Sequence, residues 1–115
     1  MSKLLIEGGQ RLSGTVKIHG AKNAVLPIIV ATLLNRGKCV IHNCPRLKDV
    51  FYSLEILKYI GCRVERHGDS VYIDSTNISN CHVPENLMRE MRSSVIFLGA
   101  ILARCGRAVI SYPGG

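Results

Sequence analysis

The sequence predicts an α/β fold in which helices and short strands alternate along one chain. Three features point to this class: an almost unbroken apolar run at 24–34, an amphipathic helical pattern at 48–60, and short β-type segments between and after them. With 115 residues, the chain can form one modest hydrophobic core but not two. Its composition, 47% hydrophobic and 20% charged, is typical of a folded domain rather than a disordered tail.

The first part of the chain predicts two strands, a buried helix and a third strand. Lys3–Glu7 and Thr15–His19 are short β-type segments separated by glycine-containing turns. The apolar run Ala24–Leu34 is long enough to favour a buried helix, and we expect Pro27 near its first turn, where backbone donors have no helical partner. Lys38–His42 follows as a strand.

The second part predicts a helix, a hairpin, a long helix and a final strand. Lys48–Ile60 places its apolar residues on one face and is followed by a glycine, as expected of an amphipathic helix. Cys62–Arg66 and Ser70–Asp74 flank a short turn and predict a β-hairpin. Glu85–Arg104 is interpreted as one long helix, and Arg107–Tyr112 as the last strand.

An internal repeat becomes visible when the sequence is shifted by 69 positions. The identical residues are Ala31, Leu33, Gly37, Val40 and Ile41, which fall on Ala100, Leu102, Gly106, Val109 and Ile110. Each copy is predicted to contain a buried helix, a glycine stop and a strand, a pattern that favours an internal duplication. In the same register, Asn23 and Arg92 both lie at the start of a buried helix.

The starts of these two helices are candidate anion-binding sites. A helix start has free N–H groups and a partial positive charge, which suit phosphate or carboxylate. Lys22 with Asn23, and Arg92 with Ser93 and Ser94, are residue types that would complete such sites.

Purely structural roles are open for the same residues. Lys22 could be a solvated lysine, and Arg92 could pair with Glu85 or Glu90 on an exposed helix face. A nucleotide triphosphatase is excluded, because the segment Gly14–Lys22 lacks the Gly-Lys-Ser/Thr ending of a phosphate-binding loop.

Charge and cysteine usage exclude other classes of protein. The formal net charge is +7, but the basic residues are scattered and aromatic residues make up 5%, which argues against a nucleic-acid-binding protein. The odd number of cysteines and the absence of a signal sequence predict reduced thiols in the cytoplasm. The cluster Cys39, His42 and Cys44 has no second ligand pair, so no metal site is predicted. No apolar stretch reaches the roughly 18 residues of a membrane span.

Several segments together resemble one enzyme family. Leu4–Leu26, Pro45–Val50 (PRLKDV), Met91–Ser94 (MRSS) and Ala103–Gly115 (ARCGRAVISYPGG) are similar, in this order, to blocks of the UDP-N-acetylglucosamine enolpyruvyl transferases (1-carboxyvinyltransferases). The resemblance implies a bacterial cytoplasmic transferase that opens peptidoglycan synthesis. Its substrates would be phosphoenolpyruvate and UDP-N-acetylglucosamine, and no cofactor is implied.

The resemblance also implies a fold and a domain organisation. The family fold is an inside-out α/β barrel of two domains, each built from βαβαββ repeats with buried helices. By this resemblance, residues 1–20 would provide strands of the second domain. Residues 21–115 would form the first repeat of the first domain and part of its second repeat.

For the site, the resemblance carries over to three residues. Lys22 and Asn23 resemble the pair that contacts phosphoenolpyruvate, and Arg92 resembles an arginine that holds phosphate or the sugar nucleotide. The general acid of the family, a cysteine or an aspartate, would follow directly after Gly115. No catalytic residue is therefore expected within the 115 residues, and the chain alone is predicted to be inactive.

Three alternatives are kept open. The nearest is the shikimate-pathway enolpyruvyl transferase, although Lys22-Asn23 is followed here by Ala-Val-Leu-Pro instead of a serine-rich segment. The second is an anion- or nucleic-acid-binding module, which the net charge suggests. The third is a non-catalytic interaction fragment that self-associates through unpaired sheet edges.

Overall fold

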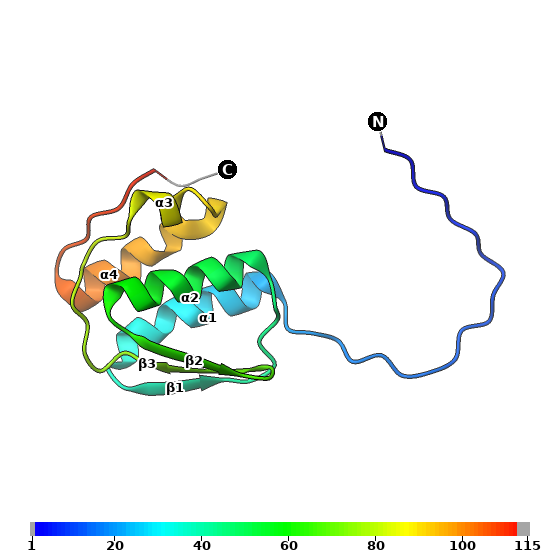
Figure 1. Ribbon diagram of the computed structural model, residues 1–115, viewed down its shortest axis with the longest axis horizontal. Coiled ribbons are helices and arrows are strands. Elements are labelled where there is room, and N and C mark those ends of the chain that lie inside the picture. Colours follow the sequence, from blue (N-terminus) through cyan, green and yellow to red (C-terminus); the bar gives the residue numbers. More distant parts are fainter. Residues whose placement is uncertain (1, 113–115) are drawn as a thin grey trace.

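The computed structural model describes residues 2–112, and its folded body is a three-stranded sheet with helices on one face (Figure 1). The elements are α1 (Lys22–Asn35), β1 (Lys38–Ile41), α2 (Lys48–Ile60), β2 (Arg63–His67), β3 (Ser70–Asp74), α3 (Glu85–Met88), the 3₁₀ helix η1 (Arg92–Ile96) and α4 (Phe97–Cys105). The predicted α/β class is confirmed.

The sheet has the order β1-β3-β2, and both strand pairs are antiparallel. The predicted hairpin is confirmed, with its first strand at Arg63–His67, one residue later than expected. The central strand β3 directs Val71 and Ile73 into the core, and both side chains are fully buried or nearly so. The sheet thus presents one apolar face to the helices and one polar face to solvent.

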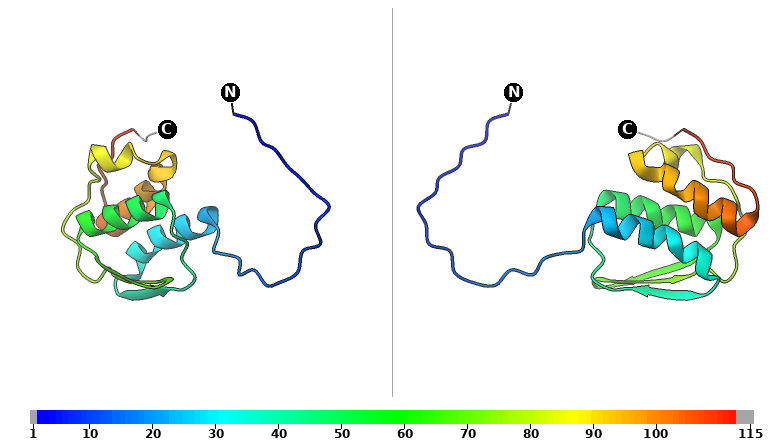
Figure 2. Two further views of the ribbon diagram at one scale, coloured as in Figure 1. Left: turned by 45° about the vertical axis from the view of Figure 1, so that its right-hand side comes forward. Right: turned by 180° about the vertical axis from the view of Figure 1, so that it is seen from behind.

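The helices form two further layers above this sheet (Figures 1 and 2). α1 and α2 lie side by side against the sheet, and α4 packs on α1 from the other side. Because α1 has neighbours on several sides, it can be apolar around most of its circumference, as a buried helix requires. The predicted burial of this helix is confirmed at its centre, where Ile29 and Leu33 are fully buried.

The three longer helices, α1, α2 and α4, run in the same direction, so they begin at the same end of the body (Figures 1 and 2). The intervening segments carry the chain back each time: β1 returns it between α1 and α2, and the segment through α3 does so before η1 and α4. This arrangement brings together residues that are far apart in the sequence.

The boundaries of α1 correct two details of the prediction. The helix begins at Lys22, so Pro27 is its sixth residue and lies beyond the first turn. Its missing N–H removes the donor that would bond to the carbonyl of Asn23. At the other end, Arg36 takes the left-handed conformation (φ 53°) that ends the helix, whereas the expected glycine stop was Gly37.

α2 has the boundaries expected from its amphipathic pattern. Asp49 lies in its first turn and Lys58 in its last, where each charge complements the helix dipole. Gly61 ends the helix with φ 123°, and its N–H bonds to the carbonyls of Leu57 and Lys58. The prediction for Lys48–Ile60 is confirmed at both ends.

The prediction of one helix over Glu85–Arg104 is wrong. Met91 is extended (φ −141°, ψ 137°) and separates α3 from η1. Its side chain is buried, and the Ser94 hydroxyl donates to the carbonyl of Met88 at 3.0 Å. Packing of Met91 and a local hydrogen bond therefore outweigh the helical pattern of the sequence.

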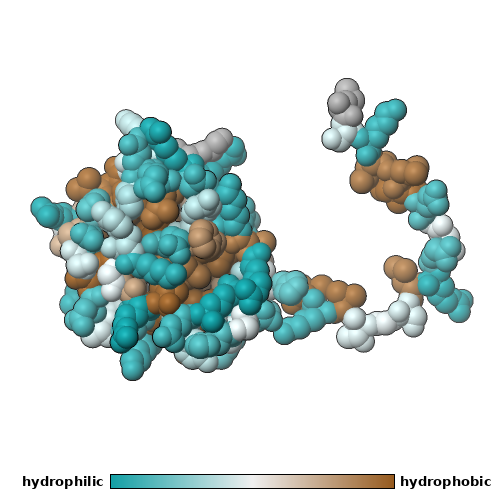
Figure 3. Space-filling view, viewed as in Figure 1, coloured by the Kyte–Doolittle hydropathy of each residue, from teal (hydrophilic) through white to brown (hydrophobic). Residues whose placement is uncertain are grey.

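The predicted strands at the two ends of the chain are also not formed. Lys3–Glu7 and Thr15–His19 belong to an extended arm that leaves the body, and its apolar side chains are exposed, Leu12 to 92% (Figure 3). Arg107–Tyr112 makes one bridge, between Val109 and His82. A strand needs a hydrogen-bonded neighbour, and neither arm segment has one within residues 2–112. None of the helices in the described part of the chain is long and apolar enough to span a membrane.

Candidate anion-binding site

The shared end of the parallel helices combines three uncapped helix starts. The residues that precede α1, α2 and η1 are Ala21, Leu47 and Met91, and none of them makes a side-chain capping hydrogen bond. α1 and α2 therefore leave backbone N–H groups available at this end, and η1 leads directly into α4. The aligned helix dipoles make this end of the body favourable for anions.

Lys22 and Asn23 are the first two residues of α1, and both are exposed. The Lys22 ammonium lies 3.4 Å from Oδ2 of Asp49 in the first turn of α2. The lysine therefore is not simply solvated, and its positive charge is directed toward the neighbouring helix start.

Arg92 is the first residue of η1 and is exposed. The two carboxylates that could have neutralised it have other partners: Glu90 lies 3.8 Å from the ammonium of Lys48, and Glu85 pairs with Arg89. Within residues 2–112, no ion pair involves Arg92. Arg92 therefore does not form the ion pair with Glu85 or Glu90 that a purely structural role would require.

Two ion pairs connect the three helix starts. The ion pair between Lys22 and Asp49 joins α1 to α2. The ion pair between Lys48 and Glu90 joins α2 to the segment just before η1. Sequence reasoning missed Lys48, Asp49 and Glu90 as parts of this cluster, because their proximity depends on the parallel packing of the helices. The signal that could have found them is that each of these helix starts carries a basic residue, Lys22, Lys48 or Arg92.

Gly20 explains how the starts of α1 and α2 come so close. A Cβ atom at this position would lie 2.5 Å from the carbonyl oxygen of Asn43, so no side chain fits. The chain before α1 therefore touches the chain before α2. Beside this contact is a hollow of about 350 Å³, lined by His19, Gly20, Pro45, Arg46, Leu47 and Asp69.

Arg46 and Arg66 are fixed in the wall near this hollow rather than available to a ligand. Nη2 of Arg46 donates to the carbonyl of Gly68 at 2.9 Å, and the Arg66 guanidinium donates to the carbonyl of Cys44. Burial raises the pKa of the Cys44 thiol, while the charge of Arg66 acts in the opposite direction. These contacts shape the loop between β1 and α2.

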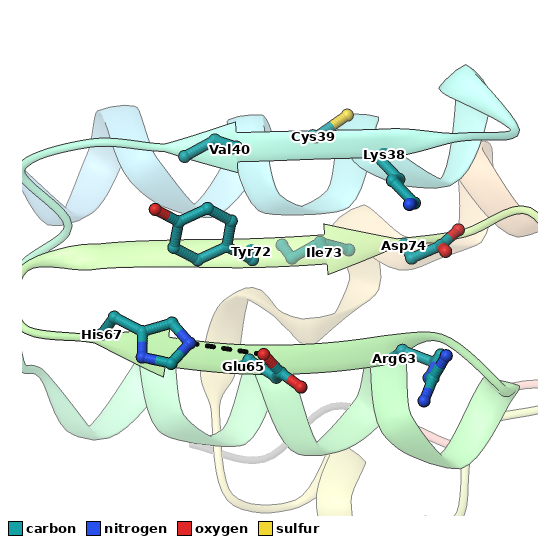
Figure 4. Close-up of a pocket in the computed structure, with 9 residues that line it drawn as sticks. All are labelled: Lys38, Cys39, Val40, Arg63, Glu65, His67, Tyr72, Ile73 and Asp74. Atoms are coloured by element: carbon teal, nitrogen blue, oxygen red, sulfur yellow. Dashed lines mark hydrogen bonds and ion pairs between the residues drawn. The ribbon is translucent and has the colours of Figure 1, made fainter.

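A second hollow, of about 510 Å³, lies on the outer face of the sheet and contains none of the predicted site residues (Figure 4). At one end, Asp74 lies between Lys38 and Arg63 on the neighbouring strands. Hydrogen bonds from Thr76 lower the pKa of Asp74, and the two cations contribute less. At the other end, His67 approaches Glu65 at 3.3 Å. This face therefore carries basic and acidic side chains next to one another.

Two further predictions concern residues away from the helix starts: the absence of a metal site at Cys39, His42 and Cys44, and a general acid after Gly115. Among residues 2–112, no group of three His, Cys, Asp or Glu side chains could hold a metal ion, and the cluster Cys39, His42 and Cys44 forms none. The His42 ring instead lies 3.0 Å from the Ser70 hydroxyl. The segment 113–115, after which the general acid was expected, lies outside the described residues.

Comparisons with known proteins agree with the sequence resemblance. A family model described as EPSP synthase (3-phosphoshikimate 1-carboxyvinyltransferase) matches residues 6–115. A protein of Caldanaerobacter subterraneus subsp. tengcongensis named UDP-N-acetylglucosamine 1-carboxyvinyltransferase 2 is 53% identical over all 115 residues. A Desulfosudis oleivorans protein named UDP-N-acetylglucosamine 1-carboxyvinyltransferase is 44% identical over the same length. The chain spans 28% of the length of each of these two relatives.

A solved structure supports the same fold. The enolpyruvyl transferase NikO from Streptomyces tendae superimposes with a TM-score of 0.75 and 26% identity, over 86% of this chain and 23% of NikO. The predicted relationship to enolpyruvyl transferase-like folds is therefore confirmed.

Proposed function

We propose a function on the premise that this chain belongs to the EPSP synthase (3-phosphoshikimate 1-carboxyvinyltransferase) family. The chain would be the N-terminal part of an enzyme that moves the enolpyruvyl group of phosphoenolpyruvate to the 3-hydroxyl of UDP-N-acetylglucosamine and releases phosphate. The observation that carries this proposal is the 53% identity, over the whole chain, to a relative named for that sugar nucleotide.

The helix starts would supply the anion-binding half of this site. Phosphoenolpyruvate has a carboxylate and a phosphate, and positive charge develops at its C2 atom during addition. Lys22 and Asn23 would hold this substrate, and Arg92 would hold the sugar nucleotide or the phosphate. Catalysis would then depend largely on positioning and on fixed charges.

The exchange of partners at Lys22 is central to the proposal. In the structure its charge is directed to Asp49, at a helix start where the dipole disfavours a cation. A bound dianion would provide a stronger partner for the same ammonium. Asp49 would then act as the group that keeps Lys22 oriented while the site is empty.

The proposal includes the domain organisation that the family resemblance implies. Residues 1–20 would contribute strands to a second domain, and residues 21–115 would form the first repeat and part of the second repeat of the first domain. The extended arm supports this, because its apolar side chains, among them Leu4, Ile6 and Val16, are exposed.

The biological setting would be the cytoplasm and the first committed step of peptidoglycan synthesis, with consequences for cell shape and division. The five reduced cysteines are consistent with that compartment. No nucleic-acid or membrane partner is proposed.

Ligand titration of the 115-residue chain tests the site. We expect Lys22→Ala to weaken the binding of phosphoenolpyruvate at least tenfold, measured by NMR titration. Lys58→Ala is the matched control, because Lys58 pairs with Glu55 in the last turn of α2, at the opposite end of that helix. Equal weakening by both variants, or no binding by the wild-type chain, would contradict the proposed role of Lys22.

The same titrations distinguish the alternatives. UDP-N-acetylglucosamine should bind in preference to 3-phosphoshikimate, and Arg92→Ala should weaken the former. Preference for 3-phosphoshikimate would indicate the shikimate-pathway enzyme instead. Steeply salt-dependent binding to arbitrary DNA would indicate a nucleic-acid-binding module. A concentration-dependent increase in size without ligand binding would indicate an interaction fragment.

Turnover is a separate test. With both substrates present, the 115-residue chain should release no phosphate, because the proposed general acid follows Gly115. Measurable phosphate release would show that the residues present suffice for catalysis.

A further inference from the structure

Two cysteines lie together at the corner where the end of α4 meets the segment before α3. Cys105 is the last residue of α4, and the left-handed Gly106 turns the chain directly after it. The returning chain then pairs with Cys81: the N–H of Val109 donates to the carbonyl of Cys81 at 3.1 Å, and the N–H of Val83 donates to the carbonyl of Val109 at 3.0 Å. These two hydrogen bonds hold both cysteines at the same corner.

The two cysteines line the same small hollow. Both are half-buried and pack against the hydrophobic core. They line a hollow of about 290 Å³ together with Arg36, Ile78, Ser79 and Arg104. Both cysteines border this hollow, and the Cys81 thiol is close enough to help raise the pKa of Cys105. A hollow of this size admits a small oxidant to both thiols.

The other three cysteines lack such an arrangement. Cys44 and Cys62 are buried, with 2% and 6% of their surface exposed. Cys39 lies on the edge strand β1, and its sulfur accepts a hydrogen bond from the Asn35 amide at 3.3 Å. Cys81 and Cys105 therefore share one hollow, and the other three thiols lie elsewhere in the fold.

We propose that Cys81 and Cys105 are a thiol pair that hydrogen peroxide converts to a disulfide. In the first step, the sulfur of one thiolate attacks a peroxide oxygen, the O–O bond breaks, and a sulfenic acid and water result. In the second step, the other thiol attacks that sulfur, the S–S bond forms, and the hydroxyl leaves as a second water. The two sulfur atoms are oxidised, the two peroxide oxygens are reduced, and the thiol protons end in the two waters.

The charges around the pair determine its reactivity. Burial and the neighbouring Cys81 thiol raise the pKa of Cys105, while Arg104 and Arg107 oppose this to a smaller extent. Because the thiolate is the nucleophile, oxidation should accelerate about tenfold per pH unit below that pKa. The pair is thus slow at neutral pH in a reducing compartment and reacts when peroxide is abundant.

The disulfide would add a covalent link to the hydrogen bonds that already join these two parts of the fold. Cys81 and Cys105 are 24 positions apart in the sequence, and the enclosed segment contains α3, η1 and α4. Oxidation would fix the end of α4 to the connector that follows β3. The inference does not depend on the proposed enzymatic function.

Peptide mapping tests the proposal directly. The reduced 115-residue chain is treated with hydrogen peroxide and digested with trypsin without reduction. We expect the number of free thiols to fall from five to three, and Cys105-Gly106-Arg107 to appear linked to the peptide that contains Cys81. Cys81→Ser and Cys105→Ser should each abolish the link, and Cys39→Ser should leave it unchanged.

A second measurement needs no variant. Phenylarsine oxide bridges two adjacent thiols, so one equivalent should protect Cys81 and Cys105 together from maleimide labelling. The proposal is overturned if five free thiols persist in excess peroxide, if the link joins other cysteines, or if it forms between two chains. It is also overturned if the arsenical protects no pair.

Discussion

The Lys22 ammonium lies 3.4 Å from Oδ2 of Asp49, and this ion pair joins the first turns of α1 and α2. Asp49 stabilises the fold in two ways. Its negative charge interacts favourably with the dipole at the start of α2, and it also offsets the positive charge of Lys22 at the start of α1. Any anion that binds at this end must share Lys22 with Asp49 or displace it.

Asp49→Asn should lower the free energy of unfolding by about 0.5–1 kcal/mol, because both effects are lost. Urea unfolding at low ionic strength measures the change, and added salt should reduce it. Glu55→Gln is the control: its exposed pair with Lys58 lies toward the end of α2, and we expect a loss below about 0.5 kcal/mol. Equal losses for the two variants would contradict a special role of Asp49.

Arg104 should be the most sensitive basic residue for stability. Its guanidinium donates to the carbonyls of Leu33 and Ser75, both at 2.7 Å, and so connects α4 with the ends of α1 and β3. Arg104→Met should cost about 2–3 kcal/mol, because half-buried carbonyl groups lose charged donors.

Two comparisons sharpen the Arg104 experiment. Arg104→Lys should rescue little, because one ammonium cannot reproduce the planar fork that reaches both carbonyls. Exposed Arg107→Met should change the free energy of unfolding by less than about 0.5 kcal/mol. Full rescue by lysine would mean that the charge, rather than the hydrogen-bond geometry, is what matters.

Two glycines should respond to alanine in opposite directions. At Gly61, φ is 123° and an added Cβ would lie 2.8 Å from the amide nitrogen of Ser79, so Gly61→Ala should destabilise by about 2 kcal/mol or more. At Gly99, inside α4, nothing lies within 4 Å of an added Cβ. Gly99→Ala should therefore stabilise by about 0.5–1 kcal/mol. Thermal unfolding of both variants provides the check, and the same sign for both would be the contrary result.

Alkaline pH should destabilise the fold through Cys62. Burial raises the pKa of this thiol to about 11, whereas an unfolded chain releases the proton near about pH 8.5. Between these values the native state holds a proton that the unfolded state has lost, so stability falls as pH rises. It is fully present below about pH 8.5, and the loss reaches about 3 kcal/mol near pH 11.

Urea unfolding in reductant at pH 7.5 and pH 10.5 measures this effect. Cys62→Ala should be less stable at pH 7.5, because it leaves a small cavity, but it should lose less stability between the two pH values. An identical pH dependence in the variant would assign the loss to other groups.

The sequence predicted those helices and hairpins well whose boundaries depend only on nearby residues. The apolar stripe of Lys48–Ile60 and the glycine after it define α2 at both ends, and the hairpin alternation holds to within one residue. The break at Met91 could not be predicted, because its cause is burial against distant elements and there is no glycine or proline at that point. The predictions of strands at Lys3–Glu7 and Thr15–His19 were wrong, because β-type residues favour an extended chain but do not supply the neighbouring strand that must pair with it.

The candidate site divides in the same way. Lys22 and Asn23 could be placed at a helix start from the local pattern, whereas Arg92 could be placed at one only by the repeat register that aligns it with Asn23. The contacts Lys22–Asp49 and Lys48–Glu90 could not be predicted, since they join residues 27 and 42 positions apart in the sequence. Their roles in binding stay predictions until the titrations are made.

The shared direction of α1, α2 and α4 has a kinetic consequence. After each helix, the chain must travel back along the body before the next helix can start, so no two of them can pair as a hairpin with a short loop. We expect the packing of α1 on α2 to form together with the pairing of β1 and β3, because β1 and the following loop connect the two helices. The folding rate should accordingly fall well below that of an up-and-down helical bundle of equal length, with a transition state that already contains the sheet.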